Sequence, residues 1–247
     1  MWNFVPLLVL FAAPCLTVDP GSPLFLTPLI EKGEISKAQL LSLVPPFNEE
    51  EPVRSFSGFI TVNASTNASM FFWFFPASLR TEAPLIVWLQ GGPGSTSLFG
   101  QFVEMGPYQI DPKDNTSVIL RKIAPWSYYY NLVFIDQPVG TGFSFTDDPD
   151  DYRTDQNGVA DYLFKFISQF SQLFPTAVKE GLYVSGESYA GKYVPSFSHR
   201  VFKEMQQGTS PITLKGFMVG DGLSDPESVI ITPISFLLFK NINHFQR

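Results

Sequence analysis

The second half of the chain alternates between continuous apolar runs and helical patterns, and this alternation restricts the fold more than any other feature. The runs at 131–135, 182–185 and 214–219 have the apolar character of strands and are bounded by turn-forming residues. Helical patterns at 155–175 and 189–207 fill the gaps between them. Strand, helix, strand, helix, strand is the order of an α/β protein, so we expect a mostly parallel sheet with right-handed crossovers.

The apolar patterns predict which faces of these helices and strands are buried. The apolar residues of the first helix fall on one face and are Val159, Tyr162, Leu163, Phe166, Ile167, Phe170, Leu173 and Phe174, before a stop at Pro175. The run 85–90 is apolar without interruption, which predicts a strand covered on both faces. The runs 57–62 and 70–77 flank a polar turn and predict a hairpin.

A serine lies where one strand must turn into a helix. The segment "VSGESYAG" places Ser188 between Gly186 and the pair Ala190 and Gly191. A nucleophile elbow needs small residues at these flanks, because a larger side chain would collide with the neighbouring strand and helix. Ala190 stands where the strict pattern has glycine, and a helix N-cap serine is an equal interpretation of this segment alone.

A glycine-rich loop follows another predicted strand in "VWLQGGPGSTS". Gly91, Gly92 and Gly94 free backbone N–H groups to face a ligand, as an oxyanion hole requires. A phosphate loop would need a following Lys-Ser/Thr, which this segment does not have, and a plain Gly-Pro turn is the other alternative. Loop and elbow together favour hydrolysis by acyl transfer.

Several longer motifs occur in one order along the chain: "WLQGGPGSTS", "GPYQI", "NLVFIDQPVGTGFSF", "GESYAGKYVP" and "GFMVGDGLSDP". From about residue 23 to about residue 230 the sequence resembles the serine carboxypeptidases, especially their vitellogenic-like branch. The resemblance implies an α/β-hydrolase fold, of which this would be the N-terminal part of the mixed, mostly parallel sheet with flanking helices. It also implies release of C-terminal amino acids from peptides through an acyl-enzyme at acidic pH.

The resemblance assigns roles residue by residue. It makes Ser188 the nucleophile and the N–H groups of Gly92 and Tyr189 the oxyanion hole. It gives the binding of the peptide's free carboxylate to Gln90, Gly91, Glu104 and Glu187. Two carboxyl groups in one pocket should share a proton, which raises one pKa and lets a neutral glutamic acid donate to the substrate. Taken alone, the two glutamates would be read as solvated surface acids.

The sequence also departs from the family. Ser95 stands where many relatives have cysteine, and the only cysteine, Cys15, lies in the predicted leader, so the mature chain would have no internal disulfide. Gln90 replaces the Asn of most members, which keeps the amide and lengthens its reach by one methylene.

The first residues are typical of a secretory signal peptide. We assign 1–17 to it and 18–247 to the carboxypeptidase-like domain, with a divergent tail at 231–247; a buried N-terminal strand or helix is the alternative for the leader. Sequons at Asn63, Asn67 and Asn115 would be glycosylated in this pathway. The expected location is the secretory route, either outside the cell or in the lysosomal or endosomal lumen.

Charge narrows the possible partners. The formal net charge is -7 and no cluster of Lys and Arg occurs, which argues against nucleic acid as a partner. No segment reaches membrane-spanning length, so we expect no membrane anchor. We predict no metal or cofactor, and peptide or protein C-termini as the binding partners.

The sequence offers no well-placed histidine to act as the base for Ser188. In this fold the acidic residue and the histidine follow the serine, and the family's own lie beyond residue 247. His199 is eleven residues along the helix, roughly 16 Å from Ser188 at 1.5 Å per residue, which is too far. His244 follows no strand able to position it. Two interpretations stand: a C-terminally truncated serine carboxypeptidase, or an inactive luminal peptide-binding protein or unstable fragment. A lipase or acyltransferase is disfavoured by the predicted carboxylate site.

Overall fold

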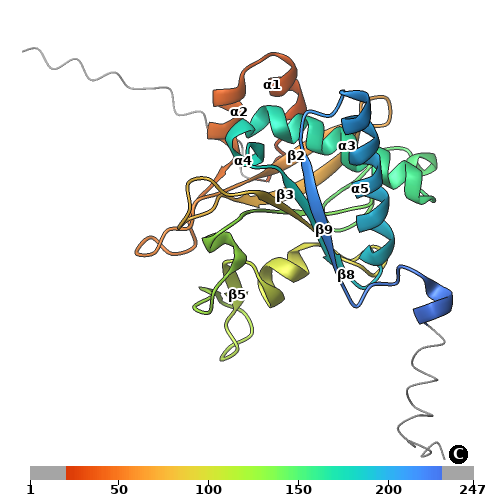
Figure 1. The fold of residues 1–247 in the computed structure, drawn as a ribbon. Helices are drawn as coiled ribbons and strands as arrows, with labels where there is room; N and C mark the ends of the chain where they lie inside the picture. The colour runs from red at the N-terminus through yellow and green to blue at the C-terminus, as the bar shows by residue number, and fades with distance from the viewer. Residues whose placement is uncertain (1–20, 230–247) are drawn as a thin grey trace, which may run out of the picture.

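The computed structural model describes residues 21–229, and a seven-stranded mixed sheet organises them (Figure 1). Its strands, in spatial order, are β1 (Leu43–Val44), β2 (Ser55–Asn63), β3 (Ala68–Phe75), β7 (Asn131–Ile135), β4 (Leu85–Leu89), β8 (Leu182–Glu187) and β9 (Leu214–Gly220). β7, β4, β8 and β9 run parallel, whereas β1, β2 and β3 pair antiparallel with their neighbours. All six predicted strands are present, with ends within two residues of those expected.

β4 and β8 are neighbours in the sheet, and this pairing positions the candidate site. They run parallel, with Leu89 opposite Gly186 at their carboxyl ends. The glycine loop leaves β4, and the segment carrying Ser188 leaves β8, at the same edge. Ligands of open α/β sheets bind outside the carboxyl ends of the strands, so the topology brings the two predicted motifs together.

Both faces of the central strands are covered, which explains their continuous apolar sequence. In β4, Leu85, Val87 and Leu89 pack in the larger core with the helices. Ile86 and Trp88 face the second core, with Met105, Tyr108 and other aromatic residues. Figure 1 shows the long helices α3 (Gln156–Leu173) and α5 (Ala190–Gln207) together on the helical side of the sheet.

The two long helices follow the sequence signals. Asp155 caps α3, its carboxylate accepting from the N–H groups of Asn157 and Gly158. α3 ends before Pro175, as predicted, and that proline opens the short α4 (Pro175–Val178). α5 contains Pro195 near its start and ends at Gly208, whose φ of 72° is the left-handed conformation common after helices.

Several shorter elements were not predicted. They are α1 (Thr27–Glu31), α2 (Ile35–Ser42), the π-helix η1 (Gly100–Glu104), the hairpin β5 (Tyr108–Ile110) and β6 (Val118–Leu120), and the 3-10 turns η2 (Trp126–Tyr128) and η3 (Pro149–Asp151), together with β1. The hairpin and η1 lie on the face of the sheet opposite α3 and α5.

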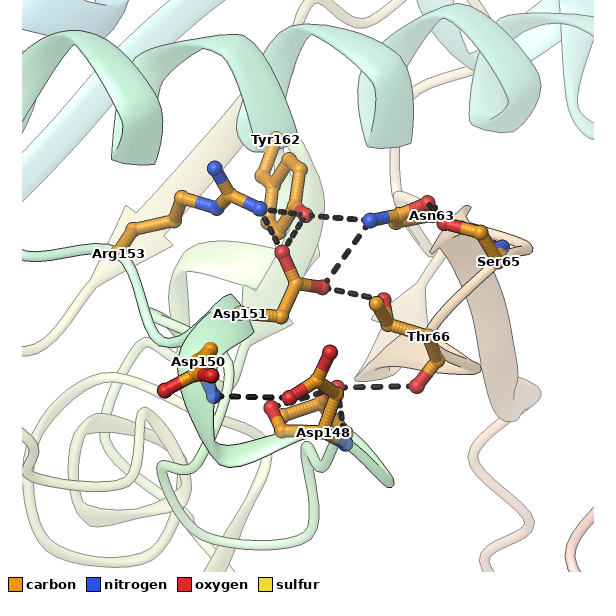
Figure 2. Close-up of polar contacts among 9 residues, drawn as sticks. Asn63, Ser65, Thr66, Asp148, Asp150, Asp151, Arg153 and Tyr162 are labelled. Atoms are coloured by element: carbon orange, nitrogen blue, oxygen red, sulfur yellow. Dashed lines mark hydrogen bonds and ion pairs between the residues drawn. The ribbon is translucent and has the colours of Figure 1, made fainter.

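A buried polar cluster ties the β2–β3 hairpin to α3 (Figure 2). Asp151 is 4% exposed and accepts from the hydroxyl of Tyr162 at 2.5 Å and from the side-chain amide of Asn63 at 3.2 Å. It also pairs with Arg153 and accepts from the hydroxyl of Thr66. A buried carboxylate is tolerated only with such partners, so the cluster fixes the turn against the helix.

Candidate active site

Ser188 lies in a strained turn between β8 and α5. Its φ is 58°, a left-handed value that costs a residue with a Cβ about 1–2 kcal/mol. Three backbone hydrogen bonds hold it: its N–H donates to the carbonyl of Gly220, and its carbonyl accepts from the N–H groups of Gly191 and Leu223. This is the geometry of a nucleophile elbow rather than of an ordinary N-cap.

The small flanking residues are required by close packing. A Cβ added at Gly186 would lie 2.3 Å from the carbonyl oxygen of Leu89 and 2.6 Å from the Cβ of Ala190. Gly191 is equally confined, because a Cβ there would lie 2.5 Å from the backbone N of Leu223. The expected collision with the neighbouring strand and helix is confirmed.

The glycine loop packs directly on the elbow. A Cβ at Gly91 would lie 2.7 Å from the backbone N of Tyr189 and 2.9 Å from the Cβ of Ser188. Gly92 follows with a φ of 108°, a conformation that side chains rarely adopt. Gly92 and Tyr189, the predicted oxyanion-hole donors, therefore come from two segments that meet beside Ser188.

Asp136, which sequence reasoning did not single out, organises this loop. It is 1% exposed, and its Oδ1 accepts from the hydroxyl of Thr96 at 2.6 Å and the N–H of Ser97 at 2.9 Å. Its Oδ2 accepts from the N–H of Phe143 at 2.9 Å. A charged residue directly after an apolar strand was the available signal. Burial raises the pKa of Asp136, and these hydrogen bonds oppose the rise.

Gln90 has a fixed amide orientation. The indole N–H of Trp88 donates to Gln90 Oε1 at 2.9 Å, so Nε2 faces the opposite way and donates to Glu187 Oε1 at 2.6 Å. Gln90 is 5% exposed. The longer side chain, compared with asparagine, thus bridges a buried indole and a site carboxylate.

Glu104 lies at the end of η1 and faces Glu187. Burial raises the pKa of the Glu104 carboxyl to about 7, with further contributions from Glu187 and then Asp221, while Arg121 lowers it. The Oε2 atom of Glu104 is buried and has no hydrogen-bond partner among residues 21–229. The raised pKa keeps the Glu104 carboxyl protonated, and therefore neutral, to higher pH, as expected for one of two carboxyl groups in one pocket.

A cavity of about 450 Å³ joins these features. Its lining residues are Gln90, Gly91, Gly92, Ser95, Thr96, Phe99, Glu187 and Ser188. Five of the seven predicted site residues line it, and Glu104 and Tyr189 do not. Larger hollows of about 790 and 750 Å³ lie elsewhere on the described part, and neither is lined by Ser188.

The described residues place no histidine at this cavity. His199 lies within α5, and the helical rise separates its Cα from that of Ser188 by roughly 16 Å. His244 lies outside the described residues, as do the predicted signal peptide and the tail at 231–247. No group of three or more His, Cys, Asp or Glu suited to a metal occurs within 21–229.

The three sequons differ in their surroundings. Asn115 is exposed, in a turn with a φ of 56°. Asn67 donates from its side chain to Asp147 at 3.0 Å. The Nδ2 atom of Asn63 donates to both Asp151 and Tyr162, so a glycan on this nitrogen would leave one hydrogen for two partners (Figure 2).

Within the described residues, no helix combines the length and apolar character needed to cross a membrane.

Comparison with known proteins agrees with this geometry. The probable serine carboxypeptidase CPVL of Homo sapiens is 48% identical over 214 residues, which cover 86% of this chain and 44% of that protein. The vitellogenic carboxypeptidase of Aedes aegypti is 44% identical over 230 residues, which cover 92% of this chain and 47% of that protein. This chain thus spans slightly less than half the length of these relatives.

A solved structure shows the same architecture. The crystal structure of Kex1(delta)p, a prohormone-processing carboxypeptidase from Saccharomyces cerevisiae, superposes with a TM-score of 0.68 at 28% identity, covering 82% of this chain and 46% of that one. The fold is that of an α/β-hydrolase with a serine at its elbow. The sequence profile described as "Serine carboxypeptidase" matches residues 45–244, and the chain belongs to that family.

Proposed function

We propose that this chain carries the peptide-recognition site and the nucleophile of a serine-type carboxypeptidase. The observation that carries the proposal is the convergence of Ser188, the glycine loop and Glu187 at one cavity, with Glu104 close enough to interact with the Glu187 carboxyl. A peptide with a free C-terminus would place its carboxylate against Gln90, Gly91 and the glutamate pair. Its last peptide bond would then lie beside Ser188.

The glutamate pair explains how an acidic pocket can bind a carboxylate. Because the pKa of Glu104 is about 7, its carboxyl is neutral in acid and can donate a hydrogen bond to the substrate carboxylate. Above that pH the Glu104 carboxyl is charged and repels the ligand carboxylate. We therefore propose binding that strengthens as pH falls, which suits an acidic lumen of the secretory or lysosomal route.

The chemical step follows from the elbow. The Ser188 oxygen would add to the carbonyl carbon while its proton passes to a base. The C–N bond then breaks, the C-terminal amino acid leaves with a proton, and water later hydrolyses the acyl-enzyme. The N–H groups of Gly92 and Tyr189 would bind the oxyanion, aided by the positive N-terminal end of α5.

A second candidate function rests on the position of His199. No histidine of residues 21–229 reaches Ser188, so a histidine base would have to come from outside the described residues. If His244 does not supply it, this chain alone binds peptide C-termini without cleaving them. Loss of the serine's base lowers the rate by several orders of magnitude.

Two measurements on the 247-residue chain separate these functions. We expect N-acetyl-phenylalanyl-leucine to bind at about pH 5, roughly tenfold more tightly than its C-terminal amide, by calorimetry with the Ser188→Ala variant. Equal affinity for the acid and the amide would refute the carboxylate site. We expect no leucine release by the unaltered chain; release that Ser188→Ala abolishes would favour the enzyme and identify His244 as the base to test.

A further inference from the structure

Arg121 holds the chain on both sides of Glu104. It follows β6 directly, and its Nε donates to the carbonyl of Gly106 at 2.8 Å while a terminal guanidinium nitrogen donates to the carbonyl of Phe102 at 3.0 Å. Its backbone N–H also donates to the carbonyl of Pro107 at 2.8 Å. One residue thus satisfies three carbonyls that bracket the glutamate in sequence.

These bonds matter because Glu104 ends a π-helix. The last carbonyls of a helix have no partner within it, and π-turns are wide and uncommon. η1 packs tightly inward: a Cβ at Gly100 would lie 2.4 Å from the indole nitrogen of Trp88 and 3.1 Å from Glu104 Oε2. The guanidinium of Arg121 adds donors to the carbonyls of Phe102 and Gly106, which lie on either side of Glu104 in the sequence.

Arg121 is also the cation that acts on the Glu104 carboxyl. The other charged groups that influence it are both acidic, Glu187 at the end of β8 and Asp221 after β9. Burial lowers the pKa of Arg121, and the negative charge of Glu104 opposes that fall, so the attraction is mutual. A partly buried charge exerts a stronger field than an exposed one.

We propose that Arg121 is a positioning residue of the carboxylate site, which holds the turn carrying Glu104 so that this carboxyl faces Glu187. The inference rests on the proposed function for its biological meaning, although the placement of Glu104 can be measured without ligand. A purely structural role in anchoring the β5–β6 hairpin would affect stability and leave the titration of Glu104 unchanged.

The sign of the expected effect follows from the charges. Arg121 lowers the pKa of Glu104, so removing its charge raises that pKa and keeps the carboxyl protonated to higher pH. Arg121→Gln removes the charge and Arg121→Lys retains it. Both lack the guanidinium fork that contacts two carbonyls at once.

The test is a titration of the Glu104 side-chain carboxyl by ¹³C NMR in the full chain. Arg121→Lys keeps the charge and loses the fork, so we expect its midpoint to fall, because a looser turn moves Glu104 away from Glu187. Arg121→Gln loses both, so its midpoint should lie about 0.5–1 unit above that of Arg121→Lys. The control Lys122→Gln, which removes an exposed neighbouring charge, should leave the midpoint near the unaltered value. An Arg121→Lys midpoint equal to that of Lys122→Gln would overturn the proposal.

A binding measurement separates this inference from the function on which it rests. In the Ser188→Ala background at about pH 5, we expect Arg121→Lys to weaken binding of N-acetyl-phenylalanyl-leucine about fivefold, since a looser turn misplaces Glu104. Lys122→Gln should bind as the parent does. If the parent binds acid and amide equally, the proposed function fails while the titration still decides the role of Arg121. Unchanged affinity in Arg121→Lys would count against the positioning role.

Discussion

The backbones of Ser188 and Gly91 are sterically restricted, the first by a strained conformation and the second by close contacts. Ser188 keeps a left-handed φ of 58° because hydrogen bonds to Gly220, Gly191 and Leu223 fix the peptide groups around it. Gly91 lies so close to the elbow that its α-carbon has no room for a methyl group. These two positions therefore set how near the glycine loop can approach the serine.

Substitution of Gly91 tests this contact. A Cβ at 91 would lie 2.7 Å from the carbonyl oxygen of Glu187 and from the N of Tyr189, and backbone atoms cannot move aside without disturbing the elbow. We expect Gly91→Ala to lower the free energy of unfolding by about 2–3 kcal/mol and to abolish dipeptide binding. Urea denaturation and calorimetry measure both. Gly220→Ala is the control, since its nearest neighbour would be Glu187 Cβ at 3.8 Å.

Elements with one dominant pattern were predictable from the sequence. β4 is apolar throughout and β7 is apolar after Asn131 because both faces of these strands are buried, and α3 has a single apolar stripe ended by Pro175. The β5–β6 hairpin and η1 were not predicted. Their strands are three residues long, and a π-turn of five residues has no periodicity of its own.

The helix cap offers a test at this scale. The carboxylate of Asp155 accepts from two N–H groups that the first turn of α3 leaves without helical partners. We expect Asp155→Ala to lower the free energy of unfolding by about 1 kcal/mol, measured by urea denaturation. Glu50→Ala, at an exposed position, should change it by less than about 0.5 kcal/mol. Equal effects of the two substitutions would contradict the cap.

The sequence predicted which residues form the candidate site, but it did not predict the hydrogen bonds between them. Ser188 and the glycine loop had local signatures, whereas the family resemblance was needed to select Glu104 and Glu187. The bond from Gln90 to Glu187 joins residues 97 positions apart, and the bonds of Asp136 cross between two loops. Such contacts depend on strand order, which no local pattern encodes.

In the whole molecule, the residues of the candidate site lie together at one edge of the sheet. The loops after β4, β7 and β8 meet there, and η1 brings Glu104 from the face opposite the long helices. Placing two acidic side chains together lowers the free energy of unfolding, and this loss is smallest at low pH. The described residues thus hold the proposed nucleophile and the proposed acid-dependent recognition site, in a chain that covers slightly less than half the length of its relatives.

Global stability should reflect this cost. The pKa of Glu104 rises from 4.5 to about 7 on folding, so between these values the folded state holds more protons and stability falls as pH rises. Allowing for its partial exposure, we expect a loss of about 1–2 kcal/mol across this window. Glu104→Gln should remove this part of the pH dependence in urea denaturation. Glu50→Gln should retain it, and identical slopes in both variants would refute the assignment.

The proposed carboxylate site is tested most directly by a crystal structure of the Ser188→Ala chain with N-acetyl-phenylalanyl-leucine at about pH 5. We expect the ligand carboxylate against Gln90, Gly91 and Glu104, with the peptide carbonyl next to residue 188 and within reach of the N–H groups of Gly92 and Tyr189. A ligand seated elsewhere, for instance in the hollow lined by Trp126, Tyr183 and Met218, would contradict it.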